Sequence, residues 1–273
     1  MVQPVSDSIV SFASPPVVEV VAGVAFDGLT SEAGALLAAF WKEQLRQQFP
    51  SIQQQPPYSA TDEQFPFEGR SISLNLFPGL PAARLWAQSS DGQEVLQLQP
   101  GWFACNWRKV QSGGEYDRWS SRREAFRRNF IALSDYLSQE GAGQPKVRQC
   151  EVTYINHITV SGVWSDHSDI AKVFKISPPL DVSYPLEQVS YQTQFRLERD
   201  GEPFGRLYTK VLPAFGADGR TPLYVFELTA RGTPQGDGVE GALGFLDQGR
   251  RAIDLTFVAL TTEAMHEEWG FQP

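Results

Sequence analysis

The histidines are the first residues to consider for chemistry, and the chain has three of them: His157, His167 and His266. No pair stands at a spacing that binds zinc with a third ligand nearby, so the sequence predicts no metal site. His157 follows Asn156 in a β-favouring segment, where an imidazole could act as a general base. A hydrogen-bonded structural histidine is the commoner role, because general-base catalysis needs a second reactive group that converges on the ring.

Two carboxylates in the last predicted helix are the other catalytic candidates. Asp247, Arg251 and Asp254 fall on one helix face, and they form either an internal ion network or the polar floor of a cavity. We favour the network. A hydrolase or nuclease without a familiar motif would need His157 within about 4 Å of Asp247 or Asp254 in an open pocket.

Other charged clusters have simpler interpretations. The arginines between Arg118 and Arg128 spread around a predicted helix, which indicates a solvated, salt-bridged surface. His266 with its neighbouring glutamates indicates a solvated face of a short terminal helix. Trp269 is predicted to anchor the C-terminal segment, because its ring would otherwise be exposed.

Motifs of the common enzyme classes are absent. The sequence contains no Cys-x-x-Cys pair, no phosphate-binding Gly-x-x-x-x-Gly-Lys loop, no Gly-x-Ser-x-Gly elbow and no Gly-x-Gly-x-x-Gly turn. The sequence therefore predicts no cofactor and favours a protein without catalytic activity.

The composition restricts the classes of molecule that the protein is expected to bind. The formal charge of −9 opposes attraction to phosphate backbones and anionic lipids, so nucleic acid is disfavoured. Cys105 and Cys150 are expected to be free thiols in a reducing compartment. The start of the chain lacks the pattern of a signal peptide, and Val17–Phe26 is too short to span a bilayer. We expect a cytoplasmic protein with a protein or small-molecule partner; the sequence does not determine its identity or the oligomeric state.

The first half of the chain alternates strand and helix signals. Val17–Phe26 is predicted as a buried strand, and apolar residues at three- and four-residue spacing predict a helix over Ser31–Phe49, capped by Thr30 or Ser31. Short strands follow at Ile72–Leu76, Arg84–Gln88, Glu94–Gln99 and Trp102–Val110, with a tight turn at Asp91-Gly92. A helix over Tyr116–Gln139 has its apolar stripe at Trp119, Phe126, Phe130, Leu133 and Leu137.

The second half repeats this order of elements. A strand over Val147–Val160 precedes a short helix at Asp166–Lys175, strands near Tyr191–Leu197, Gly205–Leu212 and Leu223–Ala230, and a helix over Val239–Leu260 with apolar residues on two faces. We predict an α+β fold of two β-α-antiparallel-meander-α units, residues 1–146 and 147–273, packed as one body. The order is similar to that of TATA-binding-protein-like and helix-grip folds, a likeness that carries no function.

One segment is predicted to be a long loop. Ser51–Gly69 is rich in Gln, Pro and Ser and shows no periodicity. Its aromatic residues Tyr58, Phe65 and Phe67 either pin the loop to the body or contact a partner. They are our candidate binding residues.

Several segments together resemble an uncharacterised, sporadically distributed family of bacterial proteins of about this length. These segments are Ser14–Val20, Leu96–Leu98 with Asn106–Arg108, Tyr154–His157 and Phe257–Gly270. The last segment contains the sequences Leu260-Thr261-Thr262 and Trp269-Gly270. The resemblance implies a bacterial, cytoplasmic protein, and the patchy distribution is similar to that of accessory or defence genes.

Three functional hypotheses follow. The sequence favours a non-catalytic module that binds a ligand or a protein. The first alternative is the motifless hydrolase or nuclease that uses His157 with Asp247 or Asp254. The second alternative is an antitoxin, immunity or phage-defence accessory protein, which depends on the resemblance alone.

Overall fold

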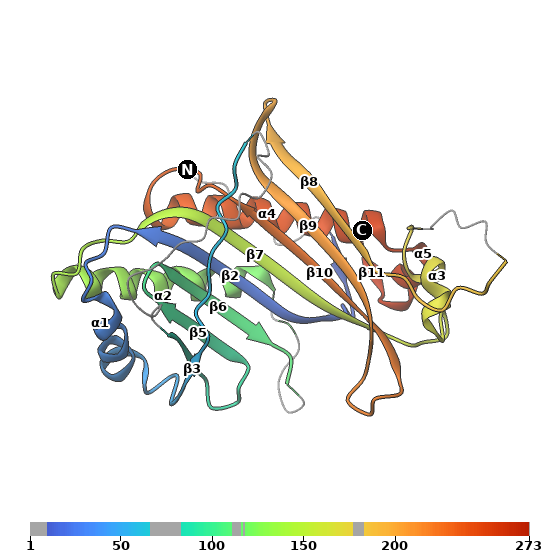
Figure 1. Cartoon of the computed structure of the whole chain (residues 1–273), viewed down its shortest axis with the longest axis horizontal. Helices are drawn as coiled ribbons and strands as arrows, with labels where there is room; N and C mark the ends of the chain where they lie inside the picture. The colour runs from blue at the N-terminus through green and yellow to red at the C-terminus, as the bar shows by residue number, and fades with distance from the viewer. Residues whose placement is uncertain (1–9, 66–82, 111–115, 117, 177–182, 273) are drawn as a thin grey trace.

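Nine antiparallel strands form one sheet in the order β3-β4-β5-β6-β2-β7-β10-β9-β8 (Figure 1). The structure is a computed structural model that describes residues 10–65, 83–110, 116, 118–176 and 183–272. The sheet strands are β2 (Val17–Asp27), β3 (Ser51–Gln55), β4 (Arg84–Gln88), β5 (Glu94–Gln99), β6 (Trp102–Arg108), β7 (Lys146–Thr159), β8 (Tyr191–Arg199), β9 (Glu202–Phe215) and β10 (Pro222–Gly232). The predicted α+β class is confirmed, and the predicted strand Ile72–Leu76 lies outside the described residues.

Strands β2 and β7 lie side by side at the centre of the sheet. Both are rich in buried apolar residues, as expected of strands covered on both faces. Their antiparallel pairing places Ala22 opposite Val152 and joins the two halves of the chain. On its outer side, β2 pairs with β6, which is the last sheet strand of the first half of the chain. In the same way β7 pairs with β10, the last sheet strand of the second half.

Helices α2 (Trp119–Gln139) and α4 (Gly238–Leu260) cover the same face of the sheet, and Figure 1 shows both behind it. The predicted apolar stripe of α2 is buried, and Phe126 and Phe130 pack against Phe103 of β6. α4 comes close to the sheet at Gly249, where a Cβ would lie 2.8 Å from Cγ1 of Val152. Glycine is therefore required there by close packing.

The first helix is shorter than predicted. α1 spans Ala33–Phe40 and continues as one π-helical turn, η1 (Trp41–Leu45), instead of running from Ser31 to Phe49. The predicted cap at Thr30 or Ser31 is wrong, since the N-cap residue is Glu32 and no side chain caps the helix. The apolar spacing still identified the buried side, because Leu37 and Phe40 are buried.

The predicted loop Ser51–Gly69 is wrong in its first five residues. Ser51–Gln55 forms the edge strand β3, which pairs with β4 through backbone hydrogen bonds. Its side chains are mostly polar, so the sequence shows no alternation that would predict a strand. Residues 56–65, here called the strap, have no regular secondary structure. They cross the face of the sheet opposite α2 and α4, where they appear as the cyan trace in Figure 1. Residues 66–69 lie outside the described residues.

The last long helix is buried on one face only. Leu243, Leu246 and Ile253 are buried as predicted, but Leu255 is 46% exposed and Ala259 is also exposed. Of the second apolar face, Phe245 is buried and Ala252 is half-buried, whereas Leu255 and Ala259 face solvent. No helix in the described part of the chain is long and apolar enough to cross a membrane.

The two ends of the described chain meet. Strand β1 (Ser11–Phe12) pairs with β11 (Phe271–Gln272), next to the short helix α5 (Glu263–Glu268). Trp269 is only 6% exposed, and its ring lies 5.2 Å from that of Phe257 and 5.9 Å from that of Phe12. Its predicted burial is confirmed.

The predicted short helix in the second half is present as two short turns. They are a 3-10 turn, η2 (His167–Asp169), and the helix α3 (Ile170–Val173). Asp166 caps the first turn by accepting a hydrogen bond of 2.8 Å from the backbone N–H of Ser168.

Candidate functional site

A large cavity opens between the N-terminal segment, the end of β7, the start of α2 and the C-terminal half of α4. Its volume is about 910 Å³, which is within the range of small-molecule sites. Residues of both halves line it, from Val10–Val18 and Trp119 to His157 and Arg250. We call it the seam pocket.

Two tyrosines from different halves meet in the seam pocket. The hydroxyls of Tyr116 and Tyr154 are 2.9 Å apart and share a hydrogen bond. Burial raises the pKa of Tyr116 to about 12 and raises that of Tyr154 well above its ordinary value. Both tyrosines therefore stay protonated near neutral pH and can donate or accept one hydrogen bond to a ligand.

An acid and a base one helical turn apart form the polar part of the same wall. Arg250 Nε lies 2.8 Å from Asp254 Oδ2 on α4, and both side chains are largely buried. Their alignment does not satisfy hydrogen-bond geometry, so neither atom has a hydrogen-bond partner among the described residues. The two groups are each other's ion-pair partner, and their place in the wall of the cavity presents a guanidinium and a carboxylate to a ligand there.

Asp254→Asn is expected to make stability less dependent on pH between about 4 and 6. Burial raises the pKa of Asp254 from 3.8 to about 6, so the folded state holds this proton more tightly than the unfolded state. The free energy of unfolding therefore falls as pH rises through this window, and the loss is complete above the folded pKa. Urea unfolding of both proteins at pH 4, 5, 6 and 7 measures the effect.

The stability of the variant relative to the wild type should rise with pH across that series. Asp135→Asn, at an exposed position of α2, is the control. A relative stability of Asp254→Asn that does not change with pH would contradict the effect of burial.

His157 is exposed at the seam pocket, where partial burial lowers the pKa of its imidazole. Asp254 lines the same pocket, but in the described part of the chain no hydrogen bond or ion pair joins it to His157, so the contact within about 4 Å that a catalytic pair would need is not seen. Asn156, the neighbour of His157, is fixed by donating a hydrogen bond of 3.1 Å to the carbonyl of Phe226.

Asp247 and Arg251 lie elsewhere. Asp247 accepts hydrogen bonds of 2.7 Å from the indole N–H of Trp119 and 3.0 Å from Nε of Arg123. It therefore ties α2 to α4 and does not line the pocket. Arg251 is exposed, so the predicted ion network of Asp247, Arg251 and Asp254 is wrong, because each carboxylate faces a different arginine.

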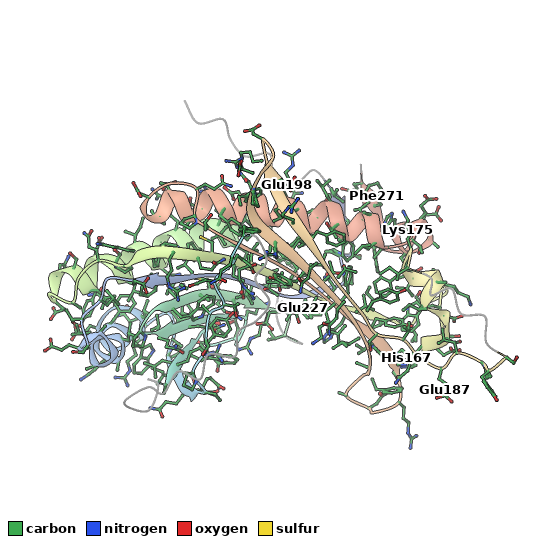
Figure 2. The ribbon with its side chains drawn as sticks, turned by 45° about the horizontal axis from the view of Figure 1, so that its top comes forward. His167, Lys175, Glu187, Glu198, Glu227 and Phe271 are labelled. Carbon is green, nitrogen blue, oxygen red and sulfur yellow. The ribbon has the colours of Figure 1, made fainter. Side chains whose placement is uncertain are left out.

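The other two histidines are structural. Nε2 of His167 lies 3.1 Å from the carbonyl of Leu223, and Figure 2 shows this ring near the start of β10. His266 is buried, with Nε2 2.8 Å from Oγ1 of Thr261. The predicted solvated face of the terminal helix is therefore correct for its exposed glutamates and wrong for His266.

Two of the three aromatic residues predicted for binding, Tyr58 and Phe65, belong to the strap. The ring of Tyr58 lies 4.4 Å from that of Trp102, and the guanidinium of Arg206 lies 4.3 Å from the ring of Phe65. Both contacts hold the strap on the sheet, which is the structural role considered for these rings. Phe67 lies outside the described residues.

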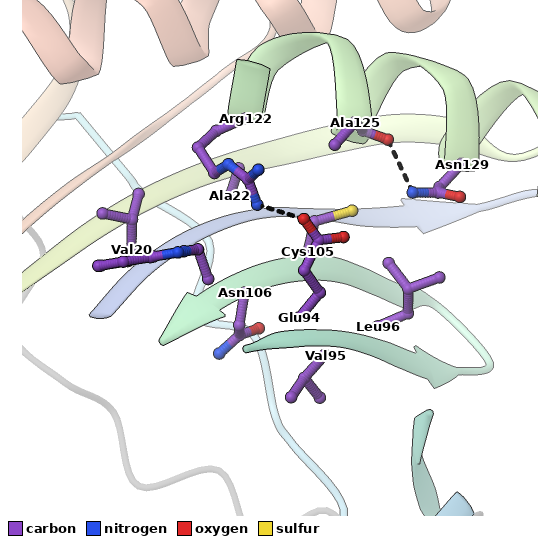
Figure 3. Close-up of a pocket in the computed structure, with 11 residues that line it drawn as sticks. Val20, Ala22, Glu94, Val95, Leu96, Cys105, Asn106, Arg122, Ala125 and Asn129 are labelled. Atoms are coloured by element: carbon purple, nitrogen blue, oxygen red, sulfur yellow. Dashed lines mark hydrogen bonds and ion pairs between the residues drawn. The ribbon is translucent and has the colours of Figure 1, made fainter. Parts of the chain in front are cut away.

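A second, small cavity lies under α2 at Cys105 (Figure 3). Its volume is about 10 Å³, enough for about one water molecule. The ion pair of Arg122 with Glu94, at 2.8 Å, closes one side. Burial raises the pKa of the Cys105 thiol, so it is not a reactive thiolate. Cys105 and Cys150 are both free, as predicted.

Sequence analysis did not identify Tyr116, Tyr154 and Arg250 as site residues. The only available signal for Arg250 was its four-residue spacing from Asp254 on the predicted helix. Among the described residues, no group of three or more histidine, cysteine, aspartate or glutamate side chains is placed to hold a metal ion. Comparison of the chain with protein-family models, with curated proteins and with solved structures finds no match.

Proposed function

We propose that this protein is a non-catalytic binding module that holds a small molecule in the seam pocket. The observation that supports this proposal is the largely buried Arg250–Asp254 ion pair in the wall of a cavity of about 910 Å³. A large pocket with a few converging polar groups is the usual form of a ligand site.

The lining suggests the chemistry of the ligand. Lys109, Arg118 and Arg250 supply positive charge, against the carboxylates of Asp254 and Glu268. The remaining wall includes apolar residues such as Phe12, Ile253, Phe257 and Met265. A molecule with one anionic group, a hydroxyl or amine and an apolar part would match both regions.

The strand order supports a site at this position. We propose that residues 1–146 and 147–273 are structural copies, because β2 with β6 and β7 with β10 occupy equivalent places on the two sides of the sheet centre. The pocket receives residues from both units, and crevices between such units are favoured ligand sites.

Filling the pocket should abolish binding. Thr159 is exposed and lines the seam pocket, so Thr159→Trp should occupy it without disturbing the core. Ligands are first found by thermal shift of the full chain against small carboxylates, phosphates and amines, and their dissociation constants are then measured by calorimetry. We expect Thr159→Trp to weaken every hit at least 10-fold.

Leu255→Trp is the matched control, because Leu255 is exposed on α4 and does not line the pocket. Hits that bind Thr159→Trp as tightly as the wild type would place the site elsewhere. A panel without any hit would leave the proposal without support.

A second candidate function is hydrolysis, favoured by the placement of His157 and Asp254 in one cavity. The His157 imidazole and the Asp254 carboxyl, whose pKa is about 6, could each transfer a proton to or from a ligand bound in that cavity. Mass spectrometry of the incubated hits separates the two functions. Unchanged ligand supports binding, whereas conversion that is lost in His157→Ala would support an enzyme.

A further inference from the structure

A second binding site lies on the face of the sheet that α2 and α4 leave uncovered. Strand register aligns Glu151 of β7, Arg231 of β10 and Arg206 of β9 in one row across three strands. Tyr208 is in the neighbouring row, opposite Thr229. Two guanidinium groups and a phenol thus converge on one spot, with Glu151 as the single carboxylate in the row.

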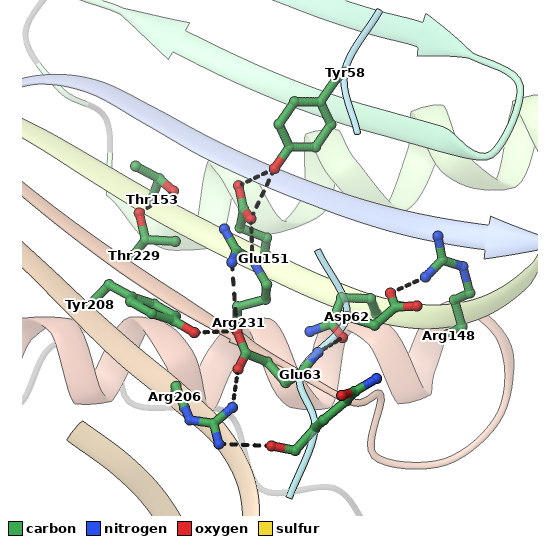
Figure 4. A network of polar contacts seen from close by, with 12 residues as sticks. Tyr58, Asp62, Glu63, Arg148, Glu151, Thr153, Arg206, Tyr208, Thr229 and Arg231 are labelled. Carbon is green, nitrogen blue, oxygen red and sulfur yellow. Dashed lines mark hydrogen bonds and ion pairs between the residues drawn. The ribbon is translucent and has the colours of Figure 1, made fainter. Parts of the chain in front are cut away.

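Glu63 of the strap occupies that spot (Figure 4). Its carboxylate forms an ion pair with Arg206, accepts a hydrogen bond of 2.7 Å from the Tyr208 hydroxyl and lies 3.5 Å from Nη1 of Arg231. The side chain of Glu63 is only 2% exposed. Arg231 also pairs with Glu151, so Glu63 adds a second carboxylate beside the two arginines, and a carboxylate fits this spot.

Side chains on the same face of the sheet form hydrogen bonds with the backbone of the strap. The amide of Gln99 exchanges two hydrogen bonds of 2.8 Å with the backbone N–H and carbonyl of Tyr58. Gln149 accepts a hydrogen bond of 3.0 Å from the backbone N–H of Glu63, and Arg206 donates one of 2.7 Å to the carbonyl of Gln64. Among the described residues, no backbone–backbone hydrogen bond ties the strap to the sheet.

Two aromatic contacts complete the recognition pattern. Tyr58 packs on Trp102, and its hydroxyl donates to Glu151 at 3.2 Å. Phe65 stacks under the guanidinium of Arg206. The sheet therefore recognises an aromatic residue, a glutamate five positions later and a second aromatic residue two positions after the glutamate.

We propose that this face is a binding site for an extended acidic peptide of another protein, and that the strap is its intramolecular occupant. Arginine clusters that hold a carboxylate are one way in which a protein surface binds an acidic segment of another chain. A tethered segment competes at an effective concentration in the millimolar range, so the strap keeps the site closed until a matching partner displaces it.

The test uses the full-length protein and a labelled peptide with the sequence of residues 56–65. In the double variant Tyr58→Ala/Glu63→Ala the strap loses its ring contact and its carboxylate. We expect this variant to bind the peptide at least 10-fold more tightly than the wild type, as measured by fluorescence anisotropy. Adding Arg206→Ala should abolish the gain, and so should a peptide with glutamine in place of its glutamate.

Equal binding by the wild type and the double variant would overturn the proposal, as would binding that does not require Arg206 or the glutamate. Displacement of the peptide by random duplex DNA at physiological salt would also overturn it, because the site would then select phosphate. The seam pocket is not altered in these variants, so failure here is distinct from failure of the proposed function.

Hydrogen exchange of the wild type tests the proposal even if the double variant does not fold. A displaceable strap should exchange the amides of Tyr58 and Glu63, which donate hydrogen bonds to the side chains of Gln99 and Gln149, at least 100-fold faster than the amides of β7 and β10. Protection of the strap equal to that of β10 would show that it opens only with the whole sheet, and would overturn the proposal.

Discussion

Replacing Trp269 with alanine is expected to lower the free energy of unfolding by about 3–5 kcal/mol. The ring is 6% exposed and packs against Phe257 and Phe12, so its removal leaves a cavity. Backbone hydrogen bonds around Trp269 prevent the neighbouring segments from moving in to fill that cavity. They are the bonds of the β1–β11 ladder together with the hydrogen bond from Ala13 N to the carbonyl of Gly270. Chemical denaturation at pH 7 measures the change.

Tyr184→Ala is the control, because Tyr184 is 83% exposed and its removal creates no cavity. A loss below about 1 kcal/mol in Trp269→Ala would mean that the C-terminal segment is not part of the cooperative core. Trp269 also lines the seam pocket, so the same variant should bind any pocket ligand less tightly.

Replacing Asp247 with alanine is expected to lower the free energy of unfolding by about 2–3 kcal/mol. Its carboxylate is 14% exposed and accepts hydrogen bonds from Trp119 and Arg123, which joins α2 to α4. Removing the Asp247 carboxylate leaves the indole N–H of Trp119 and the guanidinium of Arg123 without this acceptor. Both donors lie in a partly buried interface between α2 and α4. The loss of a charged acceptor shared by two donors is the physical reason for the size of the effect.

Glu240→Ala provides a matched control on the same two helices. Glu240 pairs with Arg127, but both side chains are well exposed, and exposed pairs contribute little. We expect no measurable change in the midpoint of urea unfolding for Glu240→Ala and a clear decrease for Asp247→Ala. Equal effects would contradict the view that burial sets the strength of the Asp247 contact.

The seam pocket and the strap site differ in what they present to a ligand. The pocket is a concave cavity in which an acid, a base and two tyrosines meet, and its size suits a small molecule. The strap site is a row of side chains on a sheet face, already occupied by the extended segment that contains Glu63. The two proposals therefore assign a small molecule to the seam pocket and a peptide to the strap site.

The sequence by itself determined the elements whose signals are local. The turn at Asp91-Gly92, the buried stripe of α2 and the central strand β2 were predicted, because each depends on periodicity or turn chemistry within a few residues. β3 was missed because pairing at a sheet edge is made by the backbone and leaves no pattern in polar side chains.

Only the tertiary structure decided which side chains meet. His157 and Asp254 were candidates from their residue types, but the sequence paired Asp254 with Arg251, and packing places it beside Arg250. The hydroxyls of Tyr116 and Tyr154 meet across 38 residues of chain, and Glu63 meets Arg206 across 143. Such contacts depend on the register of all the strands and on how the helices pack on the sheet. No local pattern in the sequence determines that arrangement.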